Sequence, residues 1–188
     1  MGVLFDGKLY HGPHMAAGEF GEMVIEAAGG MGSDEWQNRP GCMERLVSNG
    51  AICNYYSDLT GARRNANNTD TSARVRRIAE LAVSGDAPAR QTLEEAVRHL
   101  GIGISNLVWT LDADTVVIDS SITEAWTLVE PALRKHLPDG RELWVSRHLT
   151  LRPSAFGGEA ALIGAATLPL SMIFSRSSPL PLTSQAAK

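Results

Sequence analysis

Residues 93–118 read LEEAVRHLGIGISNLVWTLDADTVVI, a long amphipathic pattern followed by a run of β-branched residues. The apolar residues recur at spacings of three and four, which is typical of a helix with one buried face. They are Leu93, Val97, Leu100, Ile104, Leu107, Val108 and Leu111. Gly101 and Gly103 interrupt the pattern, and each costs roughly 1 kcal/mol in a helix interior, which indicates close packing against another backbone. Residues 115–118 (TVVI) predict a buried strand.

Helical and extended patterns alternate on both sides of this stretch. Asp6-Gly7 lies between two short β-prone runs and predicts a hairpin, because both turn positions tolerate a positive φ. The helical patterns cover residues 44–59, 72–83, 86–111, 124–136 and 159–168, with Pro169 limiting the last; residues 142–150 alternate like a strand, and residues 61–71 predict a loop. This alternation predicts an α/β arrangement with at least one crossover.

The composition is that of an ordinary globular protein. The 188 residues carry a formal net charge of −4, with 44% hydrophobic and 20% charged residues. This composition is far from that of disordered proteins and argues against a nucleic-acid-binding surface spread over the molecule, though not against a partner domain that binds DNA. No apolar run approaches the roughly 18 residues of a bilayer span, and the N-terminus lacks the apolar core of a secretory signal. Cys42 and Cys53 are too few for a disulfide framework. We therefore expect a cytoplasmic protein with reduced thiols.

Two motifs near the N-terminus carry a family resemblance. Residues 7–12 (GKLYHG) and 17–23 (AGEFGEM) resemble a signature of the form G-K-L-Y-x-G … A-G-E-[IF]-G-H-M. This signature is typical of the ROK family of sugar-responsive repressors, unclassified reading frames and sugar kinases. Further similar segments follow in the same order at residues 41–44 (GCME), 100–108 (LGIGISNLV), 114–118 (DTVVI) and 161–166 (ALIGAA).

The resemblance covers residues 2 to about 170 and implies a fold. It implies the C-terminal lobe of an actin-like, ribonuclease H-like ATPase fold, an α/β architecture in which helices flank a mixed sheet. Residues 1–170 are assigned to this lobe. The Ser- and Pro-rich residues 171–188 are expected to form a tail without fixed structure.

The resemblance also implies candidate sugar-binding residues. In the family, the Glu of E-x-G-H and the Glu of G-C-x-E accept hydrogen bonds from sugar hydroxyls, and they correspond to Glu19 and Glu44. Glu22 replaces the family's His, and an ionised carboxylate only accepts hydrogen bonds. Glu19, Glu22 and Glu44 are therefore the candidate substrate-binding residues. The alternative is that these carboxylates cap turns in a loop that has lost its ligand.

Two family motifs depart from their pattern here. Alignment on Cys42 puts Glu35 and Gln37 at two cysteine positions of the family's zinc site and Glu22 at its histidine, a donor set that zinc disfavours. Residues 119–121 (DSS) replace the Gly-Gly on the nucleotide side, which adds Cβ atoms and a carboxylate where phosphate would approach. We expect no zinc and no ATP as a cofactor, and no catalytic residue is assigned.

Three functions stay open at this stage. The favoured one is a carbohydrate-binding, regulatory lobe without catalysis, as in a sugar-responsive transcriptional regulator that binds DNA through an N-terminal domain. The second is the C-terminal part of an ATP-dependent, glucokinase-like sugar kinase that needs an N-terminal lobe. The third is a structural dimerisation module, because the long helix contributes to dimers in the family. The expected partners are a small-molecule sugar and a second copy, with no membrane.

Overall fold

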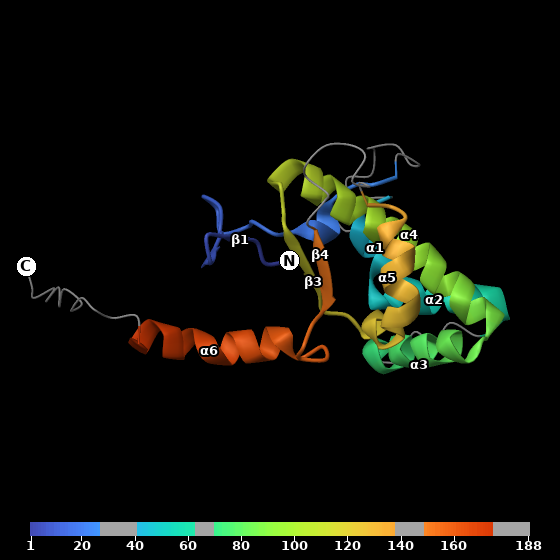
Figure 1. Cartoon of the computed structure of the whole chain (residues 1–188). Helices are drawn as coiled ribbons and strands as arrows, with labels where there is room; N and C mark the ends of the chain where they lie inside the picture. Colours follow the sequence, from blue (N-terminus) through green and yellow to red (C-terminus); the bar gives the residue numbers. More distant parts are fainter. Residues whose placement is uncertain (27–40, 63–69, 138–148, 175–188) are drawn as a thin grey trace, which may run out of the picture.

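The computed structural model describes residues 1–26, 41–62, 70–137 and 149–174, with residues 171–174 described by their backbone only. Figure 1 shows the arrangement of the helices and strands. In chain order they are β1 (Leu4–Phe5), β2 (Lys8–Leu9), the 3-10 turn η1 (Phe20–Glu22), α1 (Met43–Val47), α2 (Asn49–Thr60), α3 (Thr71–Ser84), α4 (Ala87–Leu111), β3 (Thr115–Ile118), the 3-10 turn η3 (Ser121–Ala125), α5 (Trp126–Arg134), β4 (Thr150–Pro153) and α6 (Ala160–Phe174).

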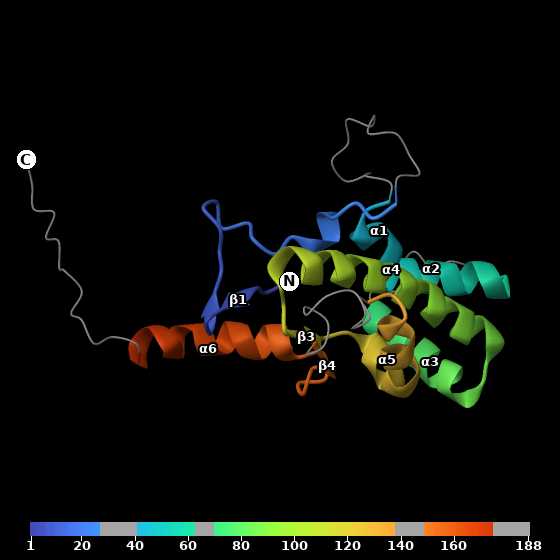
Figure 2. The same cartoon turned by 45° about the horizontal axis from the view of Figure 1, so that its top comes forward.

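Helix α4 is the centre of the helical body. Its N-terminus is capped by Asp86, whose carboxylate accepts a hydrogen bond from the backbone of Ala89 at 2.9 Å. Helices α1 and α2 pack on one side of α4 and α5 packs on the other, while α3 contacts both α4 and η3 (Figures 1 and 2). The predicted apolar stripe is confirmed, since Leu93, Val97, Ile104 and Val108 are all buried. The core of the protein therefore lies around this one long helix.

The strands form two small sheets within the described part of the chain. β1 and β2 pair antiparallel across Asp6 and Gly7, whose φ angles of 51° and 73° confirm the predicted hairpin turn. β3 and β4 pair in parallel, as a crossover connection requires. Ile118 is buried, but Val117 is 59% exposed. The strand expected to be buried is therefore buried on one face only, because no described element covers the face that carries Val117.

The first predicted helix is divided into two. Residues 44–59 were expected to form one helix, but Ser48 takes an extended conformation with a ψ of 157° and separates α1 from α2. Its hydroxyl accepts a hydrogen bond from the backbone of Ala51 at 3.2 Å. A serine in this position offers the backbone a cap in place of a continued helix, which explains the break.

Pro169 does not limit the last helix. α6 passes through it and extends to Phe174, so residues 171–174 are helical and do not belong to an unstructured tail. A proline inside a helix removes one backbone hydrogen bond, which the remaining turns of α6 tolerate. Helix 124–136 is shorter than expected and is preceded by η3. Most of the strand predicted over residues 142–150 falls outside the described residues. The described strand β4 begins at Thr150, the last residue of that range.

Helix α6 extends away from the helical body (Figures 1 and 2). Its sequence, AALIGAATLPLSMIF, carries no charged residue. Leu162, Leu168 and Leu170 are 71%, 59% and 51% exposed. No helix in the described ranges is both long and apolar enough to cross a membrane. Several apolar side chains of α6 are thus largely exposed in the part of the chain that the structure describes.

Candidate functional site

Glu19 lies immediately before a tight turn, and Glu22 is the last residue of that turn. η1 covers Phe20–Glu22, and the backbone of Glu22 donates a hydrogen bond to the carbonyl oxygen of Glu19 at 3.2 Å. The preceding Gly18 has a φ of +97°, and a Cβ at this position would collide with the Met1 carbonyl oxygen. Only glycine therefore fits where the chain enters the turn. Glu19 is exposed and Glu22 is half-buried.

Glu44 lies against the same turn. It is exposed in the first turn of α1, and its Oε2 is 3.3 Å from the position that a Cβ would take on Gly21. Gly21 stands between Glu19 and Glu22 in the sequence, so its missing side chain leaves room for the Glu44 carboxylate. The structure therefore brings Glu44 beside the turn that carries the other two predicted residues.

A short antiparallel pairing joins the segment after η1 to the segment before α1. Val24 forms an isolated β-bridge with Cys42. The backbone of Met43 donates to the Met23 carbonyl oxygen at 2.9 Å, and that of Ile25 donates to the Gly41 carbonyl oxygen at 2.9 Å. We call residues 22–26 the site strip. These bonds join the site strip to the residues immediately before Glu44.

The site rests on α4 at Gly103. A Cβ placed on Gly103 would lie 2.8 Å from Cζ of Phe20 and 2.9 Å from Sδ of Met43. The corresponding position on Gly101 is 2.6 Å from Cβ of His136, on the α5 side. The close packing predicted for both glycines is confirmed, although their partners are side chains and not another backbone. Phe20 and Met43, the residues next to Glu19 and Glu44, thus pack against α4 at Gly103.

The three carboxylates are available to a ligand. Within the ranges that the structure describes, the side chains of Glu19, Glu22 and Glu44 make no hydrogen bond or ion pair with the protein. Glu19 stands at the N-terminal end of η1 but makes no side-chain capping hydrogen bond there. This geometry does not support the alternative in which Glu19 caps a turn.

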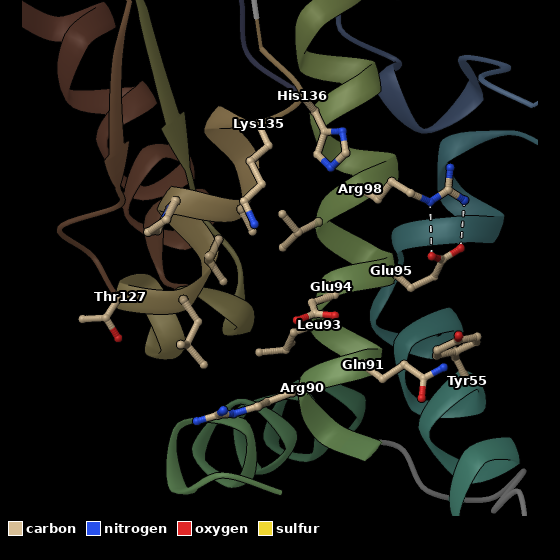
Figure 3. A pocket seen from close by; sticks show the side chains of 15 residues that line it. Tyr55, Arg90, Gln91, Leu93, Glu94, Glu95, Arg98, Thr127, Lys135 and His136 are labelled. Atoms are coloured by element: carbon tan, nitrogen blue, oxygen red, sulfur yellow. Dashed lines mark hydrogen bonds and ion pairs between the residues drawn. The ribbon is translucent and has the colours of Figure 1, made fainter. Parts of the chain in front are cut away.

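Two cavities lie elsewhere around α4. One of about 540 Å³ lies beside α4 and α5, and its lining residues include Glu94, Lys135 and His136 (Figure 3). The other, of about 350 Å³, lies between α2 and α4 and includes Glu26 and His99. None of Glu19, Glu22 and Glu44 lines either cavity. The three carboxylates therefore lie outside both of these cavities.

The family model described as "ROK family" matches residues 1–171. The chain belongs to the ROK family. Its ROK relatives include the xylose repressor of Bacillus spizizenii, 26% identical over 89% of this chain and 40% of the repressor. They also include the N-acetylgalactosamine kinase AgaK of a Shewanella species, 28% identical over 89% of this chain and 52% of the kinase.

Solved ROK structures confirm the fold expected from the sequence. A ROK glucokinase from Streptomyces griseus, in complex with glucose and AMPPNP, superposes with a TM-score of 0.68 at 23% identity. The match covers 89% of this chain and 55% of that one. The chain thus spans about half the length of the ROK kinases and less of the repressors. The architecture is the actin-like ATPase fold of ROK kinases and regulators, built here from helices and small sheets.

The structure describes some of the residues at the two departing ROK motifs. Within the described ranges, no group of three or more His, Cys, Asp and Glu side chains is placed to hold a metal ion. Cys42 is buried as a free thiol, and Glu35 and Gln37 lie outside the described residues. On the nucleotide side, Asp119 accepts a hydrogen bond from the backbone of Gly158 at 3.0 Å. This hydrogen bond joins the end of β3 to the segment before α6.

Glu26 and His99 are not among the candidate residues predicted from the sequence. The five histidines of the chain lie in unrelated segments and suggest no ligand site. In the structure, however, the His99 side chain is only 5% exposed and lies 2.7 Å from the Glu26 carboxylate. A signal was present in the helical pattern. Thr92, Ala96, His99 and Gly103 follow one another at helical spacings, and all four are buried.

Proposed function

We propose that this chain is the carbohydrate-binding lobe of a sugar-responsive ROK regulator and that it does not transfer phosphoryl groups by itself. The observation that carries the proposal is the placement of Glu44 against the turn bearing Glu19 and Glu22. None of the three carboxylates has a hydrogen-bond or ion-pair partner among the described residues. Ionised carboxylates accept hydrogen bonds from vicinal hydroxyls, which suits a small sugar.

The nucleotide side supports a regulatory role over a catalytic one. Phosphoryl transfer requires donors and a metal around the phosphates and a base beside the attacking hydroxyl. Asp119 instead places a negative charge next to Gly158. A phosphate is also negatively charged, so this carboxylate would repel it. The proposed function therefore uses neither zinc nor ATP. We propose that the protein acts in the cytoplasm.

The proposed partners follow from the same features. Relatives are repressors and kinases that are about twice as long or longer, so DNA binding would belong to a domain outside these residues. The exposed leucines of α6 support a further lobe or a second copy as a cover, because large exposed apolar patches mark interaction surfaces.

A second candidate is the C-terminal part of an ATP-dependent sugar kinase. The observation that favours it is the similarity to AgaK and to the Streptomyces glucokinase, of which the chain covers more than half. In that case the chain would phosphorylate a hexose only together with an N-terminal lobe. A purely structural dimerisation module is the third, and it predicts no sugar binding at all.

Calorimetric titration with glucose, xylose and N-acetylglucosamine separates these functions. We expect one of the sugars to bind and Glu19→Gln or Glu44→Gln to weaken it roughly 10- to 100-fold, since a hydrogen bond to a charged group contributes about 1.5–3 kcal/mol. Glu94→Gln, an exposed carboxylate on α4 away from the site, is the matched control. Phosphorylation of a hexose by the purified chain with ATP would refute the regulatory proposal.

A further inference from the structure

A buried histidine joins the site strip to α4. The His99 side chain is 5% exposed, and its Nε2 lies 2.7 Å from Oε1 of Glu26. Oε1 of Glu95, one turn earlier on α4, is 3.7 Å from the same nitrogen. His99 and Glu26 are 73 positions apart in the sequence. The contact is therefore a tertiary connection between the site strip and the helix beneath it.

Arg98 completes the cluster. Its guanidinium NH2 group lies 3.1 Å from Oε1 of Glu26 and 2.8 Å from Oε1 of Glu95, and Figure 3 shows the pair with Glu95. The hydrogen bonds from His99 and from Arg98 lower the pKa of Glu26, so its carboxylate is ionised at neutral pH. Glu26 thus accepts from both side chains of α4 at once.

Nε2 of His99 lies between an acceptor and a donor. It is 2.7 Å from Oε1 of Glu26 and 2.7 Å from the guanidinium NH2 group of Arg98. A ring nitrogen of histidine donates to a carboxylate when it carries the ring hydrogen and accepts from a guanidinium when it does not. In either tautomer His99 is bonded within the cluster, directly to Glu26 or through Arg98, which itself donates to Glu26. Nδ1 is buried and has no hydrogen-bond partner among the described residues.

Stability alone does not explain such a cluster. Buried polar groups lose hydration, and apolar side chains of similar size often stabilise a protein equally well. What hydrogen bonds add is direction, because they fix one donor against one acceptor. Glu26 belongs to the strip whose backbone bonds to Gly41 and runs antiparallel to the residues before Glu44. Fixing Glu26 therefore fixes both carboxylate-bearing segments.

We propose that His99, together with Arg98, is a positioning residue of the carboxylate site. It holds the far end of the site strip on α4, while Phe20 and Met43 sit over Gly103 one turn along the same helix. Two attachment points on one rigid helix set where Glu22 and Glu44 stand relative to each other. The sugar in this inference rests on the proposed function, but the attachment of the strip does not.

His99→Leu and His99→Gln separate positioning from packing. Leucine keeps volume and removes the hydrogen bond to Glu26, whereas glutamine retains an N–H donor. We expect His99→Leu to weaken sugar binding about tenfold, which is the loss of one hydrogen bond, and His99→Gln to restore most of it. Hydrogen–deuterium exchange should accelerate at the amides of Ile25, Glu26 and Met43 in the leucine variant. Glu94→Gln should change neither quantity.

Three outcomes would overturn the inference. They are unchanged exchange in His99→Leu, faster exchange with an unchanged sugar affinity, and exchange that accelerates equally in the core helix α3. If the wild-type chain binds none of the sugars, the proposed function fails, and exchange at the strip still decides the attachment. If His99→Leu does not fold, Glu26→Gln, which keeps the shape and removes the charge, is measured in its place with the same expectations.

Discussion

Gly103→Ala is expected to disturb the candidate site while barely changing the helix that carries it. The new Cβ would lie 2.8 Å from Phe20 and 2.9 Å from Met43, distances at which a neighbour must move. Met43 is fully buried, whereas Phe20 is half-buried and belongs to η1. Phe20 is therefore the side chain that gives way, and it shifts the turn between Glu19 and Glu22.

The magnitude follows from two opposing effects. Replacing a helical glycine by alanine stabilises a helix by about 1 kcal/mol, and inserting a methyl group into a packed core costs about 1–3 kcal/mol. The free energy of unfolding should therefore fall by at most about 2 kcal/mol, which a urea titration measures. Sugar affinity, measured by calorimetry, should fall by about tenfold or more, since the carboxylates lose their alignment.

Two further glycines provide the controls. Gly101→Ala places a Cβ 2.6 Å from His136, on the side of α4 that faces away from the site, so it should cost stability and leave sugar affinity unchanged. Gly164→Ala meets nothing within 4 Å on α6, so it should raise the free energy of unfolding by up to about 1 kcal/mol and leave sugar affinity unchanged. A Gly103→Ala variant that gains the full stability of an alanine and binds sugar normally would refute the close packing on which the site depends.

The other predictions concern charge, thiols and metal. Bonding to His99 and Arg98 lowers the pKa of Glu26 in the folded state, so its stabilisation is present above its unfolded pKa and is lost as the pH falls through the folded value. Glu26→Gln should thus lower the free energy of unfolding, measured by urea titration at about pH 7, by less than about 1 kcal/mol for a partly exposed pair. The difference between the two proteins should shrink as the pH falls from the ordinary glutamate pKa through the lower folded value. Burial raises the pKa of the Cys53 thiol, so a thiol reagent at neutral pH should label it only after unfolding; rapid labelling of the native chain would contradict its burial. A chelator should change neither the thermal midpoint nor sugar affinity, and a drop in either would show that a metal is bound.

The fold was predictable where the signal is local. The apolar spacing on α4, the β-branched run of β3 and the Asp6-Gly7 turn are each encoded within a few neighbouring residues, and the structure confirms all three. The break at Ser48 was not predicted, because one residue decides there between two hydrogen-bonding arrangements of similar energy. Pro169 misled for a related reason, since a proline is compatible with a helix that tolerates one missing bond.

The site was predictable only through resemblance. Nothing in the spacing of Glu19 and Glu44 indicates that their segments lie side by side, and the structure places Glu44 against Gly21, two residues after Glu19. The bond between Glu26 and His99 is a tertiary contact that no local pattern specifies. The burial of His99 was visible in the helical periodicity of α4, whereas its partner was not.

The two attachment points on α4 differ in what they contribute. Phe20 and Met43 over Gly103 form an apolar contact that stabilises the site but tolerates sliding, because packing is not directional. The bond from His99 to Glu26 contributes less stability and fixes one register. Where the family resemblance implies metal ligands, at Glu22 and Cys42, this chain joins the neighbouring residues Met23 and Met43 through a backbone hydrogen bond. In the described part of the chain, the strip is thus held by backbone pairing with residues 41–43, by apolar packing on Gly103 and by the polar contact between Glu26 and His99.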